Sequence, residues 1–468
     1  MEVQIISIET IKPSSPTPFH NKIFNLSLLD QLIPAPYAPL IFFYPNPHHN
    51  STTHLHEFLE NLKKSLSETL TLFYPLAGEI KNNLSIDCTE QGAHFAITKV
   101  KNINLSQFLT KLDIQVLPQL LPCGTGFESN QNEPSSRITN IQVNQFECGG
   151  LAIGICISHK ILDGTSLSTF LKSWAHAAYY NYSSASSEEK IIISPDFIAS
   201  SLFPTNNSTW LQDSANKMFF SMFKKGHPKT KRFVFDHSYI EKIRAKATKP
   251  GSKCPSRVET VSAFLWRCFM ATTTLSHDKC YVPKKHSLLT HIVNLRKKLE
   301  PNLSEYSIGN FIWVSNAKLL RNNDQTEEEL SSLVRKIRES ISIINGELVK
   351  KFQNGDEGHV LMRESLKEIE EYASMEGGVD HYGFTSWCKL GFYEVDFGWG
   401  KPIWVSGIGA SDYSVYMNFI VLMDTKCGEG VEAWVTLDER DMEVLVQNVE
   451  DYVDIDPSPL KINCDTGC

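Results

Sequence analysis

The residues best suited to acid–base chemistry in this sequence are His159 and Asp163, which stand four positions apart in the segment HKILD. An imidazole titrates close to neutral pH, so His159 can take a proton from a hydroxyl or a thiol. A pattern this short also fits a hydrogen-bonded core histidine followed by an aspartate that caps a helix. His159 is therefore a candidate general base and Asp163 its candidate support. The elements around them decide between this interpretation and a structural one.

A predicted hairpin places His159 at the end of a buried strand. Its turn is Gly149-Gly150, and apolar residues alternate with apolar or small ones along the second arm, residues 151–158. Both faces of that arm are therefore apolar or small, which is typical of a central strand. His159 continues the alternation of the bulkier residues, so its side chain should lie on the same face as theirs. The strand would hold it rigidly, and its place at the strand end would let it face a cavity. The apolar spacing that follows predicts a helix that begins near Asp163.

The composition indicates an ordinary globular protein. Its 468 residues are too many for one small core, so two domains are the natural expectation. The formal net charge is −8 and no basic surface is clustered, which argues against nucleic-acid binding. No apolar run is long enough to span a bilayer, and the start shows no signal-peptide pattern. The 11 cysteines are scattered without Cys-x-x-Cys pairs, so we expect reduced thiols in a cytoplasmic protein.

Strands and helices interleave along the chain without a strict βαβ repeat, which predicts a mixed α/β protein. We expect an N-terminal domain over residues 1–205, which carries the HKILD segment, and a C-terminal domain over residues 231–468. Between them, residues 206–230 include a Lys-rich segment that is broken by Gly226 and Pro228. These breaks predict a crossover loop between the two domains.

Other chemistries are disfavoured because their motifs are absent. The chain has no Gly-x-Ser-x-Gly nucleophile elbow, no phosphate-binding Gly-x-x-x-x-Gly-Lys-Ser/Thr loop and no dinucleotide fingerprint. A metal site is not expected either, because the one histidine-rich segment has the wrong ligand spacing. Its histidines are His48, His49, His54 and His56.

Four further segments give the sequence a family resemblance. They are FYPLAG at residues 73–78, NLR at residues 294–296, SWCKLGFYEV at residues 386–395 and DFGWG at residues 396–400. Together with HKILD they resemble the BAHD acyltransferase family of plants, in order and over essentially the whole chain. DFGWG is the most specific of these motifs. The IKPSSPTP start and the block that ends in DFGWG are similar to the subgroup that contains vinorine synthase and salutaridinol acetyltransferase.

The resemblance implies a two-domain fold like that of chloramphenicol acetyltransferase, with mixed sheets, helices and a solvent channel between the domains. Acyl-CoA and the acceptor would enter the channel from opposite sides and meet at His159. Residues 396–415, which include DFGWG, would cross back to the first domain. His159 would deprotonate an alcohol, whose oxygen attacks the thioester carbonyl directly. This implies no acyl-enzyme and no permanently bound cofactor.

The resemblance also implies roles for single residues. Asp163 would turn away from the cavity and pair with Arg296, which shapes the catalytic loop next to Gly164. Trp387, with Thr385 nearby, would donate a hydrogen bond near the oxyanion. Core packing is the alternative for this tryptophan, because a buried indole N–H needs a partner in either case.

The DFGWG segment is rich in aromatic residues and glycine, which suits a structural role in holding the channel and the loop on the CoA side. Asp396 is its one ionisable residue and is kept as a further catalytic candidate. The structural members are Phe397, Gly398, Trp399 and Gly400. A helix start suits the anionic phosphates of CoA, although an exposed arginine there can equally be solvated. The candidates for contact with CoA are Ser256, Arg257 and Asn294.

We therefore expect a cytoplasmic, monomeric O-acyltransferase whose partners are acyl-CoA, first of all acetyl-CoA, and a small-molecule alcohol. The acceptor would be a plant specialised metabolite, an alkaloid first, with a terpenoid or an acylsugar as alternatives. N-acylation of an amine, a longer acyl donor and thioester hydrolysis would use the same histidine. A non-catalytic binding protein of the same fold is the alternative from another class. The intact His159, Asp163 and DFGWG argue against it.

Overall fold

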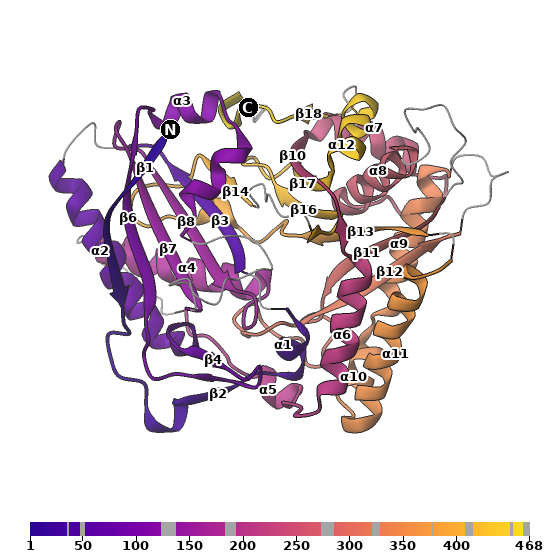
Figure 1. Cartoon of the computed structure of the whole chain (residues 1–468), viewed down its shortest axis with the longest axis horizontal. Helices are drawn as coiled ribbons and strands as arrows, with labels where there is room; N and C mark the ends of the chain where they lie inside the picture. Colours follow the sequence, from indigo (N-terminus) through magenta and orange to yellow (C-terminus); the bar gives the residue numbers. More distant parts are fainter. Residues whose placement is uncertain are drawn as a thin grey trace.

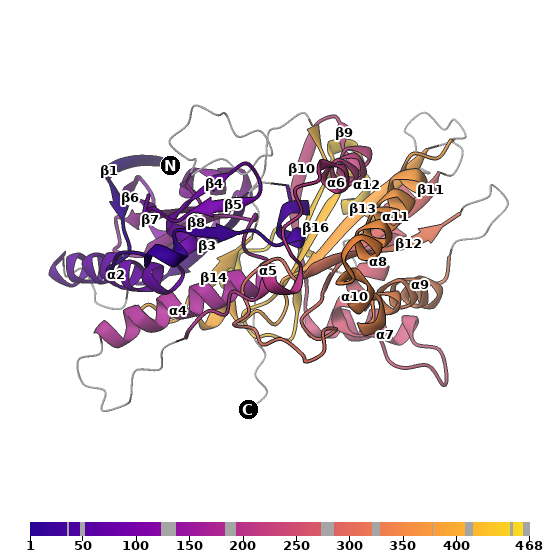
Figure 2. The ribbon, with the colours of Figure 1, turned by 90° about the horizontal axis from the view of Figure 1, so that it is seen from below.

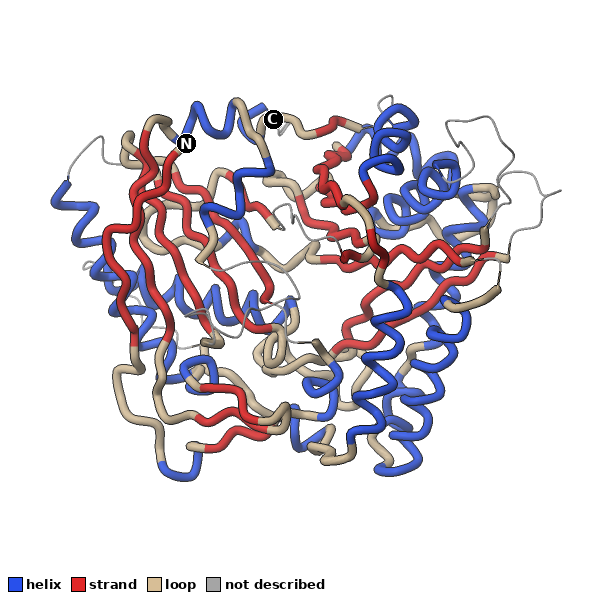
Figure 3. Tube along the Cα trace, viewed as in Figure 1, coloured by secondary structure: helices blue, strands red, loops and turns tan. Residues whose placement is uncertain are grey.

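Two large mixed sheets organise the computed structural model, one in each half of the chain (Figure 1 and Figure 3). The structure describes residues 1–34, 37–46, 52–122, 137–182, 193–272, 285–320, 328–376, 378–407, 415–449 and 453–461. The two sheets and their covering helices confirm the expected mixed α/β class. Among the helices in these ranges, none has both the length and the apolar character that crossing a membrane requires.

The first sheet has six strands in the order β1-β6-β7-β8-β3-β14. They are β1 (Glu2–Ile11), β6 (Ala93–Lys101), β7 (Thr139–Phe146), β8 (Leu151–Ser158), β3 (Tyr37–Tyr44) and β14 (Trp404–Ser406). β8 lies between β7 and β3 and all of its residues are buried, as its apolar and small side chains on both faces predict. In the β7–β8 turn Gly149 has a φ of 79°, a conformation that glycine adopts without strain.

Two helices, α2 (Thr52–Leu72) and α4 (Gly164–Tyr182), pack together against the first sheet, and Figure 2 shows them side by side. Trp174 of α4 is wholly buried, and its indole N–H donates to the backbone oxygen of Leu62 at 3.2 Å and to Ser65 Oγ at 3.1 Å. The helix that follows the HKILD segment is therefore locked to α2 by polar contacts as well as by apolar packing.

The second sheet has seven strands in the order β12-β11-β13-β16-β17-β10-β18. They are β12 (Ile312–Leu319), β11 (His286–Asn294), β13 (Val379–Ser386), β16 (Phe419–Asp424), β17 (Val431–Asp438), β10 (Pro228–Phe235) and β18 (Asp454–Ile455). One face packs on α7 (His237–Ala247), α8 (Arg257–Thr272), α9 (Leu330–Ile343) and α12 (Glu439–Val449). The other packs on α6 (Thr209–Met222), α10 (Gly346–Phe352) and α11 (Gly355–Ala373).

Smaller elements complete the described fold. A three-stranded sheet joins β2 (Ile23–Asn25), β5 (Ser85–Asp87) and β4 (Glu79–Lys81), and a two-stranded one joins β15 (Val415–Tyr416) and β9 (Lys224–Lys225). The short helices are α1 (Leu28–Leu32), α3 (Leu105–Thr110) and α5 (Ala199–Leu202).

Each half of the chain contributes a short segment to the other half. α1 belongs to the first half by sequence, yet it packs with α6 in the core on the α6 face of the second sheet. Figure 1 shows it between the two halves. Conversely, β14 pairs with β3 of the first sheet, with Trp404 opposite Phe43. Residues 408–414, which belong to the segment expected to cross back, lie outside the described residues. The boundaries of the two domains stay a prediction.

The expected crossover loop at residues 206–230 is wrong in its secondary structure, because most of it is the helix α6. The buried residues of this helix are Leu211, Ala215, Met218 and Met222, spaced three or four apart. That spacing places them on one helical face, which packs into the core shared with α11. Gly226 and Pro228 mark only the entry to β10, after the helix has ended at Met222.

Candidate active site

His159 lies directly after β8, half-buried, and its side chain is fixed by Asn310. The distance from His159 Nδ1 to Asn310 Oδ1 is 3.0 Å, and Asn310 Nδ2 donates to the backbone oxygen of His159 at 2.8 Å. Because β8 is paired on both sides, the strand gives this end little freedom to move. The imidazole is therefore held both by its backbone and by a side-chain hydrogen bond.

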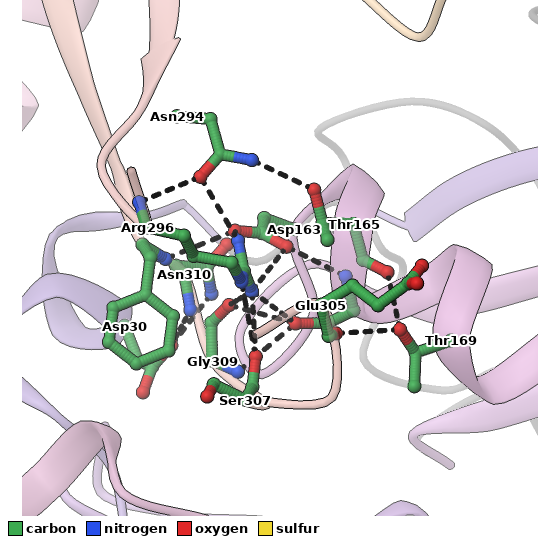
Figure 4. A network of polar contacts seen from close by, with 12 residues as sticks. Asp30, Asp163, Thr165, Thr169, Asn294, Arg296, Glu305, Ser307, Gly309 and Asn310 are labelled. Carbon is green, nitrogen blue, oxygen red and sulfur yellow. Dashed lines mark hydrogen bonds and ion pairs between the residues drawn. The ribbon is translucent and has the colours of Figure 1, made fainter. Parts of the chain in front are cut away.

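Asp163 and Arg296 form a buried ion pair with two hydrogen bonds (Figure 4). Arg296 Nη1 donates to Asp163 Oδ2 at 2.6 Å and Nη2 donates to Oδ1 at 3.0 Å. The same carboxylate caps α4, because it accepts the backbone N–H of Ser166 at 2.8 Å. Within the described residues Asp163 has no hydrogen bond with His159. The aspartate thus supports the loop and is no relay for the imidazole.

Arg296 also holds the segment that carries Asn310. Its Nη2 donates to the backbone oxygens of Ser307 at 2.9 Å and Gly309 at 3.2 Å. Asn294 accepts the backbone N–H of Arg296 at 3.0 Å and donates to Thr165 Oγ1 at 2.9 Å, and its expected contact with CoA stays a prediction. Figure 4 shows these side chains gathered around the guanidinium. The ion pair therefore ties residues 307–310 to the start of α4.

Trp387 lies against the start of α4, at the point where Gly164 allows a close approach. A Cβ atom on Gly164 would lie 3.1 Å from Leu390 Cδ1 and 3.6 Å from Trp387 Nε1. The indole of Trp387 makes an edge-to-face contact with Phe392, and its Nε1–H has no acceptor among the described residues. Trp387 is half-buried and follows Thr385 at the end of β13. Its N–H can thus serve a bound molecule.

A cavity of about 190 Å³ with a mixed polar and apolar lining lies beside Trp387, between the loop that follows β13 and the β16–β17 turn. Asp424 and Gly428 line the cavity, and both accept hydrogen bonds from Arg257, which is not a lining residue. Arg257 Nη2 donates to Asp424 Oδ1 at 3.1 Å, and its Nη1 donates to the backbone oxygens of Gly428 and Gly430. The guanidinium expected to contact CoA therefore already supports the wall of this cavity.

Ser256 caps α8 together with Glu259. The Glu259 carboxylate accepts the backbone N–H of Ser256 at 2.7 Å, and Ser256 Oγ accepts the backbone N–H of Glu259 at 3.2 Å. This reciprocal pair satisfies two N–H groups that a helix start leaves without partners. It also explains why Ser256 precedes a helix without any need for a ligand. A role for Ser256 and Arg257 towards CoA stays a prediction.

The DFGWG segment forms a tight turn whose first residue binds its own backbone. Asp396 Oδ1 accepts the N–H groups of Gly398 at 2.8 Å and Gly400 at 3.0 Å. Both glycines have positive φ values, 91° and 96°, which other residues adopt only with strain. The aromatic side chains are buried, Phe397 against Trp174 and Trp399 against Phe58. Asp396 thus stabilises the turn by these contacts, and the segment anchors the return to the first sheet.

Sequence reasoning missed two residues next to the histidine, Asn310 and Asp30. Asp30 lies on α1 and accepts both the backbone N–H and the side-chain N–H of Asn310, each at 2.8 Å. Burial raises the pKa of the Asp30 carboxyl from its ordinary value, and its hydrogen bonds with Ser27 and Asn310 oppose that rise. The available signal was the segment LLDQL, in which one aspartate and one glutamine stand among three leucines.

An apolar cavity lies on the α6 side of the second sheet. It is lined by residues that include Leu29, Leu32, Met218, Ile312, Trp313 and Phe384. Leu29 directly precedes Asp30 and Ile312 lies two positions beyond Asn310, so two lining residues are close in sequence to the residues that hold His159. Among the described lining residues none is charged, and Thr290 supplies the one hydroxyl. This space suits an apolar molecule.

A metal centre finds no support. Within the described ranges, no group of three or more histidine, cysteine, aspartate or glutamate side chains is arranged to hold an ion. His54 and His56 are exposed on α2, and His48 and His49 lie outside the described residues. The two described histidines of this segment are therefore surface residues of a helix.

Comparison with known proteins identifies the family. The model of the Transferase family matches residues 1–452 of the chain. The chain belongs to this family, the BAHD acyltransferases. It is therefore an acyl-CoA-dependent acyltransferase, which moves an acyl group from acyl-CoA to a small-molecule acceptor. The family predicted from HKILD, NLR and DFGWG is confirmed.

Individual relatives agree over nearly their full length. The chain is 41% identical to a limonoid 7-O-acetyltransferase of Citrus sinensis, over 98% of this chain and 100% of the relative. It is 36% identical to salutaridinol 7-O-acetyltransferase of Papaver somniferum, over 94% of this chain and 95% of the relative. The crystal structure of vinorine synthase superposes with a TM-score of 0.78 at 31% identity, covering 98% of this chain and 100% of that one.

Proposed function

We propose that this enzyme transfers an acetyl group from acetyl-CoA to a hydroxyl of a neutral, largely apolar polycyclic metabolite. The observation that carries the proposal is the position of His159, which Asn310 holds at the end of a buried strand. Residues one and two positions away in sequence from Asp30 and Asn310, Leu29 and Ile312, line an apolar cavity. A histidine held in this way can act as a general base on a bound alcohol. The acetyl donor is supported by the relatives, because the limonoid and salutaridinol enzymes are both named acetyltransferases.

The reaction we propose is a direct transfer. His159 takes the proton of the acceptor hydroxyl, and the hydroxyl oxygen attacks the carbonyl carbon of the thioester. The tetrahedral intermediate carries an oxyanion, and we assign its stabilisation to the Trp387 Nε1–H. The carbon–sulfur bond then breaks, and protonated His159 returns the proton to the departing thiolate of CoA. The products are the acetate ester and free CoA, and the histidine ends in its starting form.

The acceptor we propose is neutral because the described lining of the apolar cavity carries no charged side chain. An ammonium group would find no carboxylate among these lining residues, and burying an unpaired ammonium group is costly. This favours a limonoid-like alcohol over the basic alkaloid that the resemblance suggested first. The same argument disfavours N-acylation, because an alkylamine is protonated at neutral pH and would enter the cavity as a cation.

The setting of the enzyme completes the proposal. We place it in the cytoplasm as a monomer, with a channel between two domains and no permanently bound cofactor. Support for a reducing compartment comes from four described cysteines that are thiols, Cys88, Cys148, Cys254 and Cys388.

The test uses purified protein, labelled acetyl-CoA and two acceptors, a neutral limonoid alcohol and salutaridinol. We expect an acetate ester from both, with the higher kcat/KM for the neutral alcohol at pH 7. In the His159→Ala variant, acetyl transfer should fall by about 10²–10⁴-fold, the usual cost of losing a general base. His56→Ala, an exposed histidine on α2, is the matched control and should keep its activity.

Three results would count against the proposal. Release of free acetate without an ester would show that the enzyme hydrolyses the thioester. A preference for the amine-containing acceptor would reject a neutral pocket. A His159→Ala protein that keeps both its circular dichroism spectrum and most of its activity would remove the histidine from the mechanism.

A further inference from the structure

We propose that Asn310 is a positioning residue that selects the tautomer of His159, and that Asp30 of α1 fixes the orientation of Asn310 that this requires. The inference rests on the proposed role of His159 as the base. It concerns three residues that lie far apart in the sequence and meet through hydrogen bonds at the boundary of the two halves. Figure 4 shows Asp30 and Asn310 next to the ion pair of Asp163 and Arg296.

The first step is that Asp30 determines which way the Asn310 amide faces. Asp30 Oδ1 accepts the backbone N–H of Asn310 at 2.8 Å, so this oxygen acts as an acceptor. The same oxygen lies 2.8 Å from Asn310 Nδ2, which donates to it. The other contact of Nδ2, at 2.8 Å, is the backbone oxygen of His159, which can only accept. Both partners of Asn310 Nδ2 are acceptors, so Nδ2 must face them. Asn310 Oδ1 must therefore face the imidazole.

The second step follows from the chemistry of a neutral imidazole. Asn310 Oδ1 is an acceptor and lies 3.0 Å from His159 Nδ1, so Nδ1 must carry the hydrogen. A neutral imidazole has one N–H, and its lone pair is then on Nε2. Nε2 is the nitrogen that the proposed mechanism needs free for the acceptor hydroxyl. The amide of Asn310 therefore keeps the base in its reactive tautomer.

The third step is that Asp30 is itself held firmly. Its Oδ2 accepts the backbone N–H of Ser27 at 2.9 Å and the Ser27 hydroxyl at 2.6 Å, and the side chain is wholly buried. On the other side of Asn310, the backbone N–H of Phe311 donates to Asp163 Oδ2 at 3.1 Å. Two buried carboxylates thus bind the backbone here, Asp30 at the N–H of Asn310 and Asp163 at the N–H of Phe311. The side-chain amide of Asn310 has little freedom to rotate.

The charged groups near His159 point elsewhere. Lys160 Nζ lies 3.1 Å from the backbone oxygen of Gln31 and 3.4 Å from that of Asp30, at the end of α1. Asp163 is paired with Arg296, and the Asp30 carboxylate is separated from the ring by Asn310. Among the described residues, the neutral amide of Asn310 is the group bonded to Nδ1. Replacing it with a carboxylate would therefore change the charge next to the ring.

The experiment compares Asn310→Ala and Asn310→Asp with Asn104→Ala as a matched control. Asn104 is also an asparagine, and its side chain caps α3 by accepting the backbone N–H of Gln107 at 2.7 Å. Loss of the amide should lower kcat by about 10–10²-fold with little change in either KM, because tautomer and ring orientation are lost. The control should lower the melting temperature and leave kcat within about twofold, since capping bonds affect stability.

The pH profile of kcat/KM gives a readout that a merely structural role would not move. An acceptor at Nδ1 favours the imidazolium, so its loss in Asn310→Ala should move the acid limb to lower pH. A carboxylate at the same place should move it to higher pH, by about one unit. The Asp30→Asn/Asn310→Asp exchange gives the new carboxylate a donor at position 30, and serves if the single variant is unstable. Shifts in the same direction for both changes at position 310 would reject the proposal.

Nitrogen-15 NMR of the wild-type protein without substrates separates this proposal from the proposed function. We expect His159 to carry its hydrogen on Nδ1 at neutral pH, and to lose that preference in Asn310→Ala. A wild-type His159 with its hydrogen on Nε2 would overturn the role of Asn310, whatever the activity. A correct tautomer in a protein whose His159→Ala variant stays active would instead overturn the role of the histidine as base.

Discussion

The guanidinium of Arg296 and the carboxylate of Asp163 are joined by two hydrogen bonds, at 2.6 and 3.0 Å, and both side chains are almost fully buried. The pair fastens the start of α4 to the strand end of β11 and to residues 307–311. Three segments distant in sequence therefore meet at one ion pair, directly beside the loop of His159. Its contribution is to the geometry of the site.

The first prediction concerns this ion pair. Asp163→Ala and Arg296→Ala should each lower the free energy of unfolding by about 3–5 kcal/mol, because each leaves a buried charge without its partner. The double variant should cost much less than the sum, since the two residues contact each other. Urea unfolding measures all three. Full additivity would show that the two side chains act independently.

A control for the ion-pair cycle is available on the same helix. Lys172 of α4 pairs with Glu305 at 3.2 Å, and both side chains are substantially exposed. Lys172→Met should change the free energy of unfolding by at most about 1 kcal/mol, as exposed pairs contribute little. Activity lost in Asp163→Ala should return poorly at high pH, because the defect is one of position.

The second prediction concerns Trp387. Trp387→Phe removes the indole N–H and keeps an aromatic ring against Phe392. If the N–H stabilises the oxyanion, kcat should fall by about 10²-fold with the KM of acetyl-CoA little changed. Phe392→Leu is the matched control, because it alters the packing of the same ring and keeps the donor. Equal kcat for wild type and Trp387→Phe would assign this tryptophan to packing alone.

The third prediction is a pH dependence of stability caused by Lys160. Burial lowers the pKa of this ammonium group to about 8, although the Asp30 carboxylate opposes the shift. Its ordinary pKa is 10.5. Between these two values the unfolded chain holds a proton that the folded chain has released, so unfolding takes up a proton. The free energy of unfolding therefore rises with pH across this window and falls as pH decreases through about 8.

Lys160→Met should lack this contribution. The difference in the free energy of unfolding between wild type and this variant should grow by about 2–3 kcal/mol in favour of wild type from pH 7.5 to 10.5. Taking a difference cancels the other groups that titrate in the same range. Lys172→Met, which removes a more exposed lysine, should show no such slope. A flat difference for Lys160→Met would mean that this lysine keeps its ordinary pKa in the folded protein.

The sequence predicted the parts of the site that follow a regular pattern. β8 and α4 were predictable because alternating and helical spacings of apolar residues determine their buried faces, and His159 lies at the junction between them. The buried pair of Asp163 and Arg296 came from the family resemblance. The same approach failed at residues 206–230, where turn-forming residues hid the apolar stripe of α6.

Asn310 and Asp30 could not be predicted in this way, because no local spacing links them to His159. They are separated from it by 151 and 129 positions in the chain, and their contacts exist only once the two halves are packed together. Arg257 is the opposite case, a residue that a local pattern singled out as a ligand contact. It begins a helix, as an anion site would require, yet the turn after β16 occupies its guanidinium through long-range contacts. Local patterns cannot reveal such partners.

The last prediction concerns the kinetic order. A ping-pong mechanism needs a nucleophile that carries the acetyl group, and the one cysteine near His159 in sequence is Cys156. Cys156 has the opposite strand parity to His159 and is wholly buried in the core of the first sheet, so it cannot meet acyl-CoA. The transfer should therefore need both substrates bound together, without an acyl-enzyme.

Initial-rate measurements test this order. Double-reciprocal plots at several fixed acceptor concentrations should intersect, and Cys156→Ala should keep most of the wild-type activity, because it removes only a small buried side chain. Mass spectrometry after mixing the protein with acetyl-CoA alone should find no added acetyl group. Parallel lines together with an acetylated protein would establish a ping-pong mechanism, and His159 would then activate a nucleophile of the enzyme before it activates the alcohol.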